Sequence, residues 1–320
     1  MQPMLATRAP SGEDLPRGPE WVYEVKWDGV RMLCDTTSGD LRLRARSGRD
    51  VTVSYPELSG LSSVQGAVLD GEVVVLSGGV PSFEALAERM NLRDPGAARR
   101  LAARSPVTYV VFDLLMLYGV DLTGRPLSER RATLERLTLP ERVQLSPVYP
   151  DVDDLWSVTL EHGLEGVLAK RLTSAYQPGR RSPDWVKAAH RSTRTAAVVG
   201  WRQEMPPAGA RAIADPTARL GAVLLGAPDG EGRWRYLGKA GSGLAGRRGA
   251  DLVRELRPLA RDTSPLDEPV PTADARAVTW CEPRVRVDVA YLQRMTSGRL
   301  RQPAVRALRT DGDVDPWEVP

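Results

Sequence analysis

The sequence predicts a two-domain protein of the α+β class, in which a mixed α and β domain is followed by a small β-barrel. The chain has 320 residues, about twice the length of an average domain. Strand-like and helix-like segments alternate in the first part, whereas short strands separated by Gly and Pro dominate the second. We therefore expect residues 1–193 to form the first domain and residues 194–320 the second.

Hydrophobic alternation identifies the strands of the first domain. In segment 21–29, Trp21 and Tyr23 share one face, while Glu24 and Lys26 share the other. Further strands are expected at 41–48, 67–76, 107–117, 164–171 and 183–191. Amphipathic patterns predict helices at 82–91, 128–137 and 151–163.

The second domain shows a different pattern. Short strands are expected at 196–201, 221–227, 233–241, 277–283 and 285–293, and a helix at 243–260. About five short strands with one helix are typical of a β-barrel of the OB type. Residues 204–218, rich in Ala and Pro, are expected to form a loop within this domain.

Composition excludes several classes of function. The two histidines, His162 and His190, are too few for a histidine-rich zinc site, and neither lies near a nucleophile elbow. Cys34 and Cys281 lack metal-ligand spacing and are expected to be reduced thiols. The N-terminus does not have the pattern of a signal peptide, and no apolar run is long enough to span a bilayer. We therefore expect a cytoplasmic protein without a membrane partner. The net charge of +3 is compatible with a polyanionic partner.

Lysine usage is the most informative count. Of 44 basic residues only four are lysines, and the other 40 are arginines. The lysines are Lys26, Lys170, Lys187 and Lys239. Arginine replaces lysine where only charge matters, but its guanidinium stays protonated and cannot act as a nucleophile. Each remaining lysine is therefore a candidate for a role that arginine cannot fill.

Three of these lysines fall within a series of short motifs. Lys26-Trp27-Asp28-Gly29 taken alone is weak, because it also describes a strand that ends in an Asp-Gly turn. Five further segments follow it in order: Arg46–Gly48, Asp70–Glu72, Phe112–Asp113, Glu165–Lys170 and Trp185–Lys187. Together they form a specific pattern.

This order resembles the motifs of the covalent nucleotidyltransferase superfamily, which comprises DNA ligases, RNA ligases and mRNA capping enzymes. The closer resemblance is to bacterial ATP-dependent DNA ligases, namely the ligase domain of ligase D and the free-standing ligase C type. It covers nearly the whole chain, through EVKWDGVR, LDGEVVVL, EGVLAKR, YQPGRRSPDWVK, YLGKAGSG and TSGRLRQPAVRALRTD. The resemblance implies an adenylation domain with antiparallel sheets over 1–193 and an OB-fold domain over 194–320.

The resemblance also implies a reaction. Lys26 would attack the α-phosphate of ATP to form a covalent lysyl–AMP, the AMP would pass to a 5′-phosphate, and a 3′-hydroxyl would displace it. Lys170 and Lys187 would contact the α-phosphate, and as neighbouring cations they would favour the neutral amine that the attack requires. The alternative for both is an ordinary surface cation.

Other positions acquire roles from the same resemblance. Glu72 and Glu165 would be oxygen ligands for Mg²⁺ or Mn²⁺, with a solvated carboxylate as the alternative. Simple strand alternation places Glu165 and Lys170 on opposite faces, so both reach one pocket only if Glu165 lies at a turn or a bulge intervenes. Phe112 would stack on adenine or pack in the core.

The nucleotide and the nick would engage further side chains. Glu24 would read the adenine amino group, Arg31 would hold ribose or phosphate, and Arg46 would engage the 5′-phosphate of the nick. Lys239 would contact the DNA backbone or lie in an ordinary hairpin loop. Arg301 and Arg309, in the arginine-rich closing segment, would contact DNA, and Arg309 with Asp311 would orient pyrophosphate during the first step.

Two positions depart from the family pattern. The family usually has a second lysine two residues after the one that matches Lys187, but this chain has Ala189 there. It also usually has Lys or Arg directly after the aspartate that matches Asp311, and here that residue is Gly312. Each departure removes a cation that would neutralise phosphate. His190, Arg191 or Arg180 are candidates to compensate, and without compensation we expect slow adenylation or sealing.

The expected partner is nicked or broken duplex DNA, bound by a monomer at the nucleoid. The resemblance adds the end-binding protein Ku and a repair polymerase as partners. The alternatives are an RNA ligase, a capping enzyme, or a weak or inactive module that binds nicked DNA, for which Ala189 and Gly312 are the support.

Overall fold

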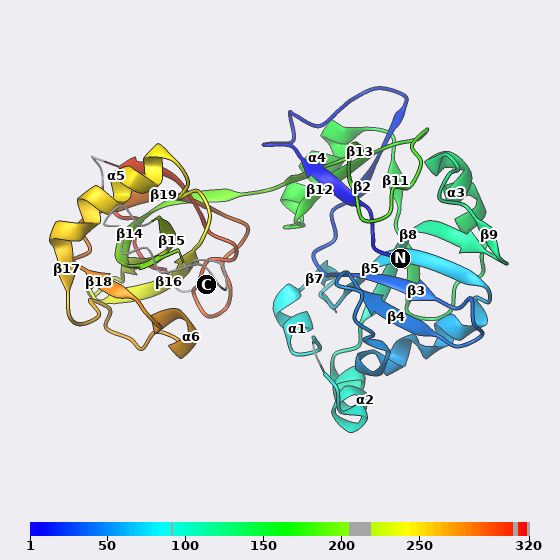
Figure 1. The fold of residues 1–320 in the computed structure, drawn as a ribbon, viewed down its shortest axis with the longest axis horizontal. Helices are drawn as coiled ribbons and strands as arrows, with labels where there is room; N and C mark the ends of the chain where they lie inside the picture. The colour runs from blue at the N-terminus through cyan, green and yellow to red at the C-terminus, as the bar shows by residue number, and fades with distance from the viewer. Residues whose placement is uncertain (91, 205–218, 310–312, 319–320) are drawn as a thin grey trace, which may run out of the picture. The chain divides into compact units, whose positions relative to one another are not determined.

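The chain folds into two units, Met1–His190 and Arg191–Pro320 (Figure 1). The computed structural model describes residues 1–90, 92–204, 219–309 and 313–318. The units divide three residues before the boundary expected at 193. Gly312, Asp311 and nearly all of the expected loop at 204–218 lie outside the described residues.

Two main sheets build the first unit. The five-stranded sheet has the order β1 (Leu5–Arg8), β13 (Arg181–Ala189), β12 (Gly166–Arg171), β2 (Trp21–Val25), β11 (Val148–Tyr149). The six-stranded sheet has the order β10 (Val143–Leu145), β8 (Thr108–Leu117), β5 (Ala67–Val74), β3 (Val30–Asp35), β4 (Arg42–Ala45), with β9 (Val120–Asp121) paired to β8. Strands β6 (Leu76–Ser77) and β7 (Val80–Pro81) form a small hairpin.

Strand pairing in this unit is mainly antiparallel, as expected. Two of its described pairs, β1 with β13 and β10 with β8, are instead parallel. The two sheets meet at a buried cluster that contains Leu33, Val68 and Phe112 from the six-stranded sheet and Trp185 from the five-stranded one. Burial of these large apolar side chains holds the sheets face to face.

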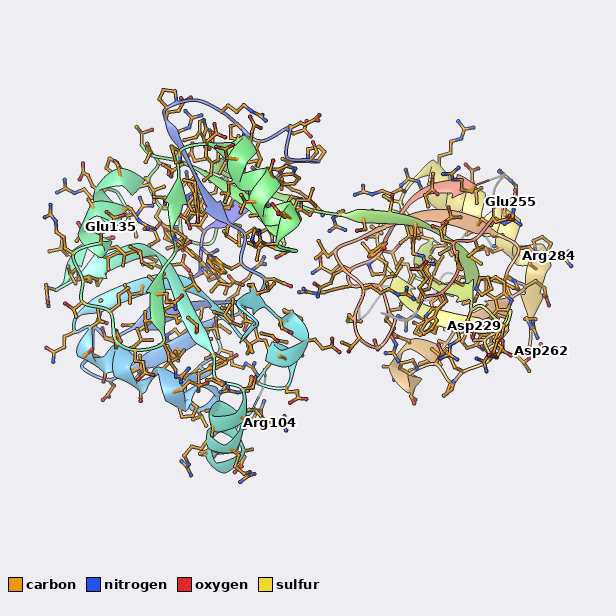
Figure 2. All side chains as sticks on the ribbon, turned by 180° about the vertical axis from the view of Figure 1, so that it is seen from behind. Arg104, Glu135, Asp229, Glu255, Asp262 and Arg284 are labelled. Atoms are coloured by element: carbon orange, nitrogen blue, oxygen red, sulfur yellow. The ribbon has the colours of Figure 1, made fainter. Side chains whose placement is uncertain are left out.

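Helices and 3₁₀ turns cover the outer sides. They are α1 (Phe83–Ala87), α2 (Pro95–Arg104), α3 (Leu127–Leu134) and α4 (Val152–Glu161), with 3₁₀ turns at Thr52–Ser54 and Pro56–Ser63. The Asp151 carboxylate caps α4 by accepting hydrogen bonds from the amides of Asp153 and Asp154, as a helix N-terminus requires. Charged side chains such as Arg104 and Glu135 lie on the outside of this unit (Figure 2).

The second unit is a curled, antiparallel sheet. Its strands are β14 (Ser192–Gln203), β15 (Leu220–Pro228), β16 (Trp234–Ala240), β17 (Ala260–Arg261), β18 (Thr279–Cys281), β19 (Arg286–Tyr291) and β20 (Ala304–Arg309). Helix α5 (Arg247–Leu256), a 3₁₀ turn (Arg257–Leu259) and α6 (Thr272–Ala275) complete it.

Strand β14 organises this barrel-like unit. Its first half pairs with β19 and its second half with β15 and β18, so one long strand serves both sides of the sheet. Apolar side chains including Val198, Leu225 and Val287 fill the interior. This arrangement is the OB-type architecture that the pattern of short strands and one helix predicts.

Among the described residues, none of the helices has the length and apolar character needed to cross a membrane.

Candidate active site

A cavity of about 180 Å³ lies between the two sheets of the first unit. Strands β1, β2, β12 and β13 of one sheet and β3, β5 and β8 of the other contribute to its walls. Seven of the nine side chains predicted to bind the nucleotide line it: Glu24, Lys26, Arg31, Arg46, Glu72, Phe112 and Lys187. The other two, Glu165 and Lys170, contact lining residues from just outside. Residues far apart in the sequence, such as Glu24 and Lys187, therefore form one site.

Lys26 directly follows β2, and its position is fixed by the backbone. Its amide donates a hydrogen bond of 2.9 Å to the carbonyl of Gly166. Gly29 then lies so close to β5 that a Cβ atom there would be 2.2 Å from the Val73 carbonyl oxygen, a distance that admits only glycine. The motif Lys-x-Asp-Gly thus brings the chain from one sheet to the other and leaves the lysine at the cavity wall.

The Lys26 ammonium forms an ion pair with the carboxylate of Glu165. These side chains are 20% and 10% exposed, respectively, so the pair is largely shielded from water. Glu165 precedes β12, and the next residue, Gly166, has a φ of +146° that side-chain-bearing residues rarely adopt. Glu165 therefore lies just outside the regular strand, so strand alternation does not decide on which side its side chain lies relative to Lys170.

Lys170 and Glu24 form a second, fully buried ion pair. Lys170 Nζ lies 2.6 Å from Glu24 Oε1, and the two side chains are 0% and 2% exposed. The ammonium also lies 4.3 Å from the centre of the Phe112 ring and 4.5 Å from that of Trp185. Burial lowers the pKa of Lys170, while the carboxylate of Glu24 acts in the opposite direction.

Arg31 is held rigidly at the cavity wall. Its Nε and Nη2 atoms each donate a hydrogen bond of 2.6 Å to the carboxylate of Asp70, a bidentate geometry. The Tyr176 hydroxyl donates to the same carboxylate at 2.5 Å. The guanidinium lies 4.5 Å from the centre of the Phe112 ring. Asp70 and Tyr176 were not predicted as site residues, although Asp70 belongs to one of the motifs.

Glu72 is the carboxylate whose titration is most perturbed within the cavity. Burial raises the pKa of Glu72 to about 7, although Arg31 and Lys26 favour its ionised form. Among the residues that the structure describes, no cluster of three or more metal-ligand side chains occurs. Glu72 and Glu165 are therefore two protein carboxylates near Lys26 that could contribute to a metal site whose other ligands come from a substrate.

Three cations at the cavity lack a carboxylate partner within the described part of the chain. They are Arg46, Arg181 and Lys187, all of which line the cavity. The pKa of Lys187 is lowered first by burial and then by the charge of Lys26, while the Glu165 carboxylate acts in the opposite direction and Arg181 and Arg46 lower it further. The lining thus contains five cations and the two carboxylates of Glu24 and Glu72, and this excess of positive charge suits a polyphosphate. Sequence reasoning did not identify Arg181, which is one of forty arginines.

Ala189 lies at the end of β13, opposite Gly166 of β12. The candidates to compensate for its missing charge have other contacts. His190 stacks at 3.9 Å on Trp156 and its Nε2 lies 2.9 Å from the Thr159 hydroxyl, while Arg191 donates a 3.4 Å hydrogen bond to the Gln302 carbonyl. Arg180 is exposed and is not among the residues that line the cavity.

The cations predicted to bind DNA in the second unit have protein partners. Lys239 Nζ lies 2.7 Å from Asp274 Oδ1, and Arg309 Nε lies 2.8 Å from Asp288 Oδ1. Arg301 is only 8% exposed, and burial lowers its pKa to about 10. A DNA contact through Arg301 would require its guanidinium to become exposed.

Comparison with known proteins identifies the family. The family described as "ATP dependent DNA ligase domain" matches residues 3–188, and "ATP dependent DNA ligase C terminal region" matches residues 216–312. DNA ligase C1 of Mycolicibacterium smegmatis is 33% identical over 337 residues, covering 99% of this chain and 91% of that protein. The multifunctional non-homologous end joining DNA repair protein LigD of Mycobacterium tuberculosis is 39% identical over 316 residues, covering 97% of this chain.

This chain spans only 39% of the length of that LigD protein. Among solved structures, a mycobacterial DNA ligase D complexed with ATP and MES has a TM-score of 0.55 and 38% identity, covering 98% of this chain and 96% of the other. A Lig E DNA ligase with 17% identity and a TM-score of 0.64 shares the fold. The extent of these matches, together with the motif residues gathered at one cavity, shows that the chain belongs to the ATP-dependent DNA ligase family.

Proposed function

We propose that the chain seals nicks or breaks with a 5′-phosphate and a 3′-hydroxyl in duplex DNA, through a lysyl–AMP on Lys26 and then a DNA-adenylate. The observation that carries this proposal is the position of Lys26. Its amine lies at the wall of a cavity lined with cations, in contact with the carboxylate of Glu165. An amine, a base beside it and positive charge for phosphates are the groups that this chemistry needs.

In the first step the Lys26 ammonium loses a proton, for which the Glu165 carboxylate is the acceptor in contact with it. The Nζ atom then forms a bond to the α-phosphorus of ATP as the bond from that phosphorus to the bridging oxygen breaks. Pyrophosphate leaves. Lys187 and Lys170 would stabilise charge on the α-phosphate, although Lys170 must then be shared with Glu24 or released from it.

The remaining steps transfer AMP and join the strands. A 5′-phosphate oxygen of the DNA attacks the phosphorus of the lysyl–AMP, and the phosphorus–nitrogen bond breaks. The 3′-hydroxyl then attacks the 5′-phosphate, and AMP departs with the bridging oxygen. Arg46 would position the 5′-phosphate, because it lines the cavity without a carboxylate partner among the described residues.

The adenine pocket would be formed by Phe112 with Glu24 and Arg31. Trp185 also lines the cavity, and its buried Nε1 atom has no hydrogen-bond partner among the described residues, so it fits this use. Glu72 and Glu165 would hold Mg²⁺ or Mn²⁺ together with phosphate oxygens, and the ion would supply further charge neutralisation.

DNA contacts beyond the cavity would come from Lys239, Arg301 and Arg309 of the second unit. The LigD relatives are named for non-homologous end joining, which favours a role in the repair of broken ends, with Ku and a repair polymerase as partners. Chromosomal DNA as the substrate would place the enzyme in the cytoplasm at the nucleoid, where it would act as a monomer.

A sealing assay tests the proposed function. The protein is incubated with ATP, Mg²⁺ or Mn²⁺ and a 5′-labelled nicked duplex, and the nick is placed in a DNA or an RNA strand. The proposal expects sealed DNA and a transient DNA-adenylate, with GTP unable to replace ATP. Preferred sealing of the RNA strand would favour an RNA ligase instead.

The absence of a lysine at position 189 favours a second candidate, a weak or inactive ligase-like module that binds nicked DNA. In the same assay that module would retard nicked duplex on a native gel without adenylate or sealed product. The active enzyme is favoured because one cavity is lined by Lys26, Lys187 and Glu72 together.

A further inference from the structure

We propose that Tyr176 is a positioning residue for nucleotide binding, which acts through Asp70 to orient Arg31. The proposal rests on the proposed function, because that function makes Arg31 a residue of the nucleotide pocket. Tyr176 lies in the loop between β12 and β13, outside the six motif segments. Its side chain is buried, and it is not among the described residues that line the cavity. Any effect of Tyr176 on a bound nucleotide is therefore indirect.

The Tyr176 hydroxyl joins two separate parts of the cavity wall. It donates a hydrogen bond of 2.5 Å to Oδ2 of Asp70 on β5, and it accepts one of 2.9 Å from the backbone amide of Met4. Met4 lines the cavity directly before β1, whereas Asp70 holds Arg31 of β3. Burial, and next the charge of Asp70, raise the pKa of Tyr176, so the hydroxyl stays protonated and can make both contacts.

The carboxylate of Asp70 links this hydroxyl to Arg31. It is fully buried, its Oδ1 accepts from Nε of Arg31, and its Oδ2 accepts from both Nη2 of Arg31 and the Tyr176 hydroxyl. A buried carboxylate depends on its protein donors, because water is not there to replace them. Without the hydroxyl, Oδ2 would retain only Arg31, and the orientation of the carboxylate and guanidinium together would be less restricted.

The orientation of Arg31 matters because few of its donors remain available. Nε and Nη2 are engaged by Asp70, so the donors on Nη1 are those that Arg31 can offer a nucleotide oxygen without breaking this clamp. The guanidinium is held 4.5 Å from the centre of the Phe112 ring. A planar group already fixed at two atoms loses little freedom when a ligand binds, and this preorganisation preserves affinity.

The ring of Tyr176 has a separate role in packing. It meets the Trp185 ring edge-on, with the ring centres 5.8 Å apart, and the Arg130 guanidinium lies 5.8 Å from its centre. Removal of the whole side chain would disturb these contacts as well as the hydroxyl. Tyr176→Phe keeps the ring and removes only the hydroxyl, so it isolates the proposed role.

Tyr109 of β8 offers a matched control for the loss of a buried hydroxyl. It is fully buried, and its hydroxyl donates to the backbone carbonyls of Met32 and Leu69. It is not among the described residues that line the cavity. Both Tyr176→Phe and Tyr109→Phe should therefore lower the urea midpoint of unfolding. Only Tyr176→Phe should change the response to nucleotide.

Each variant is measured by single-turnover self-adenylation over a range of ATP concentrations, after bound AMP has been stripped with pyrophosphate. We expect Tyr176→Phe to raise the half-saturating ATP concentration by about tenfold and to keep the maximal rate within about threefold of wild type, as loss of a purely binding contact does. Tyr109→Phe should keep the wild-type half-saturating concentration. An unchanged half-saturating concentration in Tyr176→Phe, whatever its maximal rate, would overturn the proposal.

A double-mutant cycle tests whether Tyr176 acts through Arg31. In Arg31→Ala protein, the further change Tyr176→Phe should alter the half-saturating ATP concentration by less than about twofold. Effects that multiply in the double variant would give Tyr176 a role independent of Arg31 and would overturn the proposal.

A second variant keeps the inference testable if Tyr176→Phe does not fold. Asp70→Asn has the same shape, but its amide nitrogen cannot accept a hydrogen bond, so it cannot receive both Arg31 and the Tyr176 hydroxyl in the present geometry. Its half-saturating ATP concentration should rise by about tenfold, and a wild-type value would refute the link from Tyr176 to the nucleotide.

Failure of the proposed function is distinguishable from failure of this inference. If wild-type protein takes no AMP from ATP, the proposed function fails, and equilibrium binding of ATP is measured instead. Tyr176→Phe should then bind ATP about tenfold more weakly than Tyr109→Phe does. Equal affinities of the two variants for ATP would refute the inference.

Discussion

Lys170 Nζ lies 2.6 Å from Glu24 Oε1 at a point where both side chains are excluded from water. The two residues are 146 positions apart in the sequence and belong to neighbouring strands, β12 and β2. The ammonium also lies close to the rings of Phe112 and Trp185, which line the cavity, so a buried charge pair as well as apolar packing supports the cavity.

The first prediction concerns the stability of this pair. Lys170→Met should destabilise the first unit by about 3 kcal/mol, because it leaves the Glu24 carboxylate buried without its partner. Urea unfolding monitored by tryptophan fluorescence measures the change. The double variant Lys170→Met/Glu24→Leu is the control, and it should lose less stability than the single variant. A single variant as stable as wild type would show that Glu24 finds water or another partner.

A second prediction concerns position 189. Ala189→Lys should raise the single-turnover rate of self-adenylation by about tenfold, because it places a cation on the strand face of Lys187. Ala189→Met, of similar length without charge, is the matched control and should not be faster than wild type. If Ala189→Lys folds normally and is no faster, the other cations of the cavity already supply the charge that this step needs.

A third prediction follows from the titration of Glu72. Because the folded state raises its pKa from 4.5 to about 7, the folded state holds a proton that the unfolded state has lost in this interval. Glu72 should therefore destabilise the protein increasingly as pH rises from about 4.5 to 7, and fully above 7. Glu72→Gln should be more stable than wild type at pH 8, on the order of 1 kcal/mol, and equal to it near pH 4. Thermal unfolding at both pH values measures this, and a pH-independent difference would contradict it.

Much of the fold could be predicted from local patterns. The alternation in segments 67–76 and 107–117 identified β5 and β8, and the carboxylate-rich start of segment 151–163 identified α4. Several elements were missed, including β1, β3, α2 and β20. The arginine-rich composition of Pro95–Arg104 and Ala304–Arg309 concealed the apolar periodicity of α2 and β20. Expected helix 243–260 is shorter in the structure because its glycine-rich start forms a loop before α5.

The candidate site was predicted through motif order more than through geometry. Strand alternation alone places Glu165 and Lys170 on opposite faces, but Glu165 lies before β12 and next to Gly166, whose φ is positive, so the alternation does not extend to it. Local patterns contained no signal that Glu24 pairs with Lys170 or Arg31 with Asp70, since these contacts arise between strands distant in sequence. Arg181 could not be distinguished from the other arginines by local pattern, because its place at the cavity depends on how β13 is positioned in the fold.

The proposed function depends on Lys26 as the residue that receives AMP. We would incubate the protein with ATP and Mg²⁺ or Mn²⁺, after stripping bound AMP with pyrophosphate, and locate the adduct by peptide mass spectrometry. Lys26→Arg, which keeps the positive charge but cannot act as a nucleophile, would be treated in parallel. We expect AMP on the peptide that contains Lys26 and none on the variant. An adduct on another residue, or an undiminished adduct on Lys26→Arg, would contradict it.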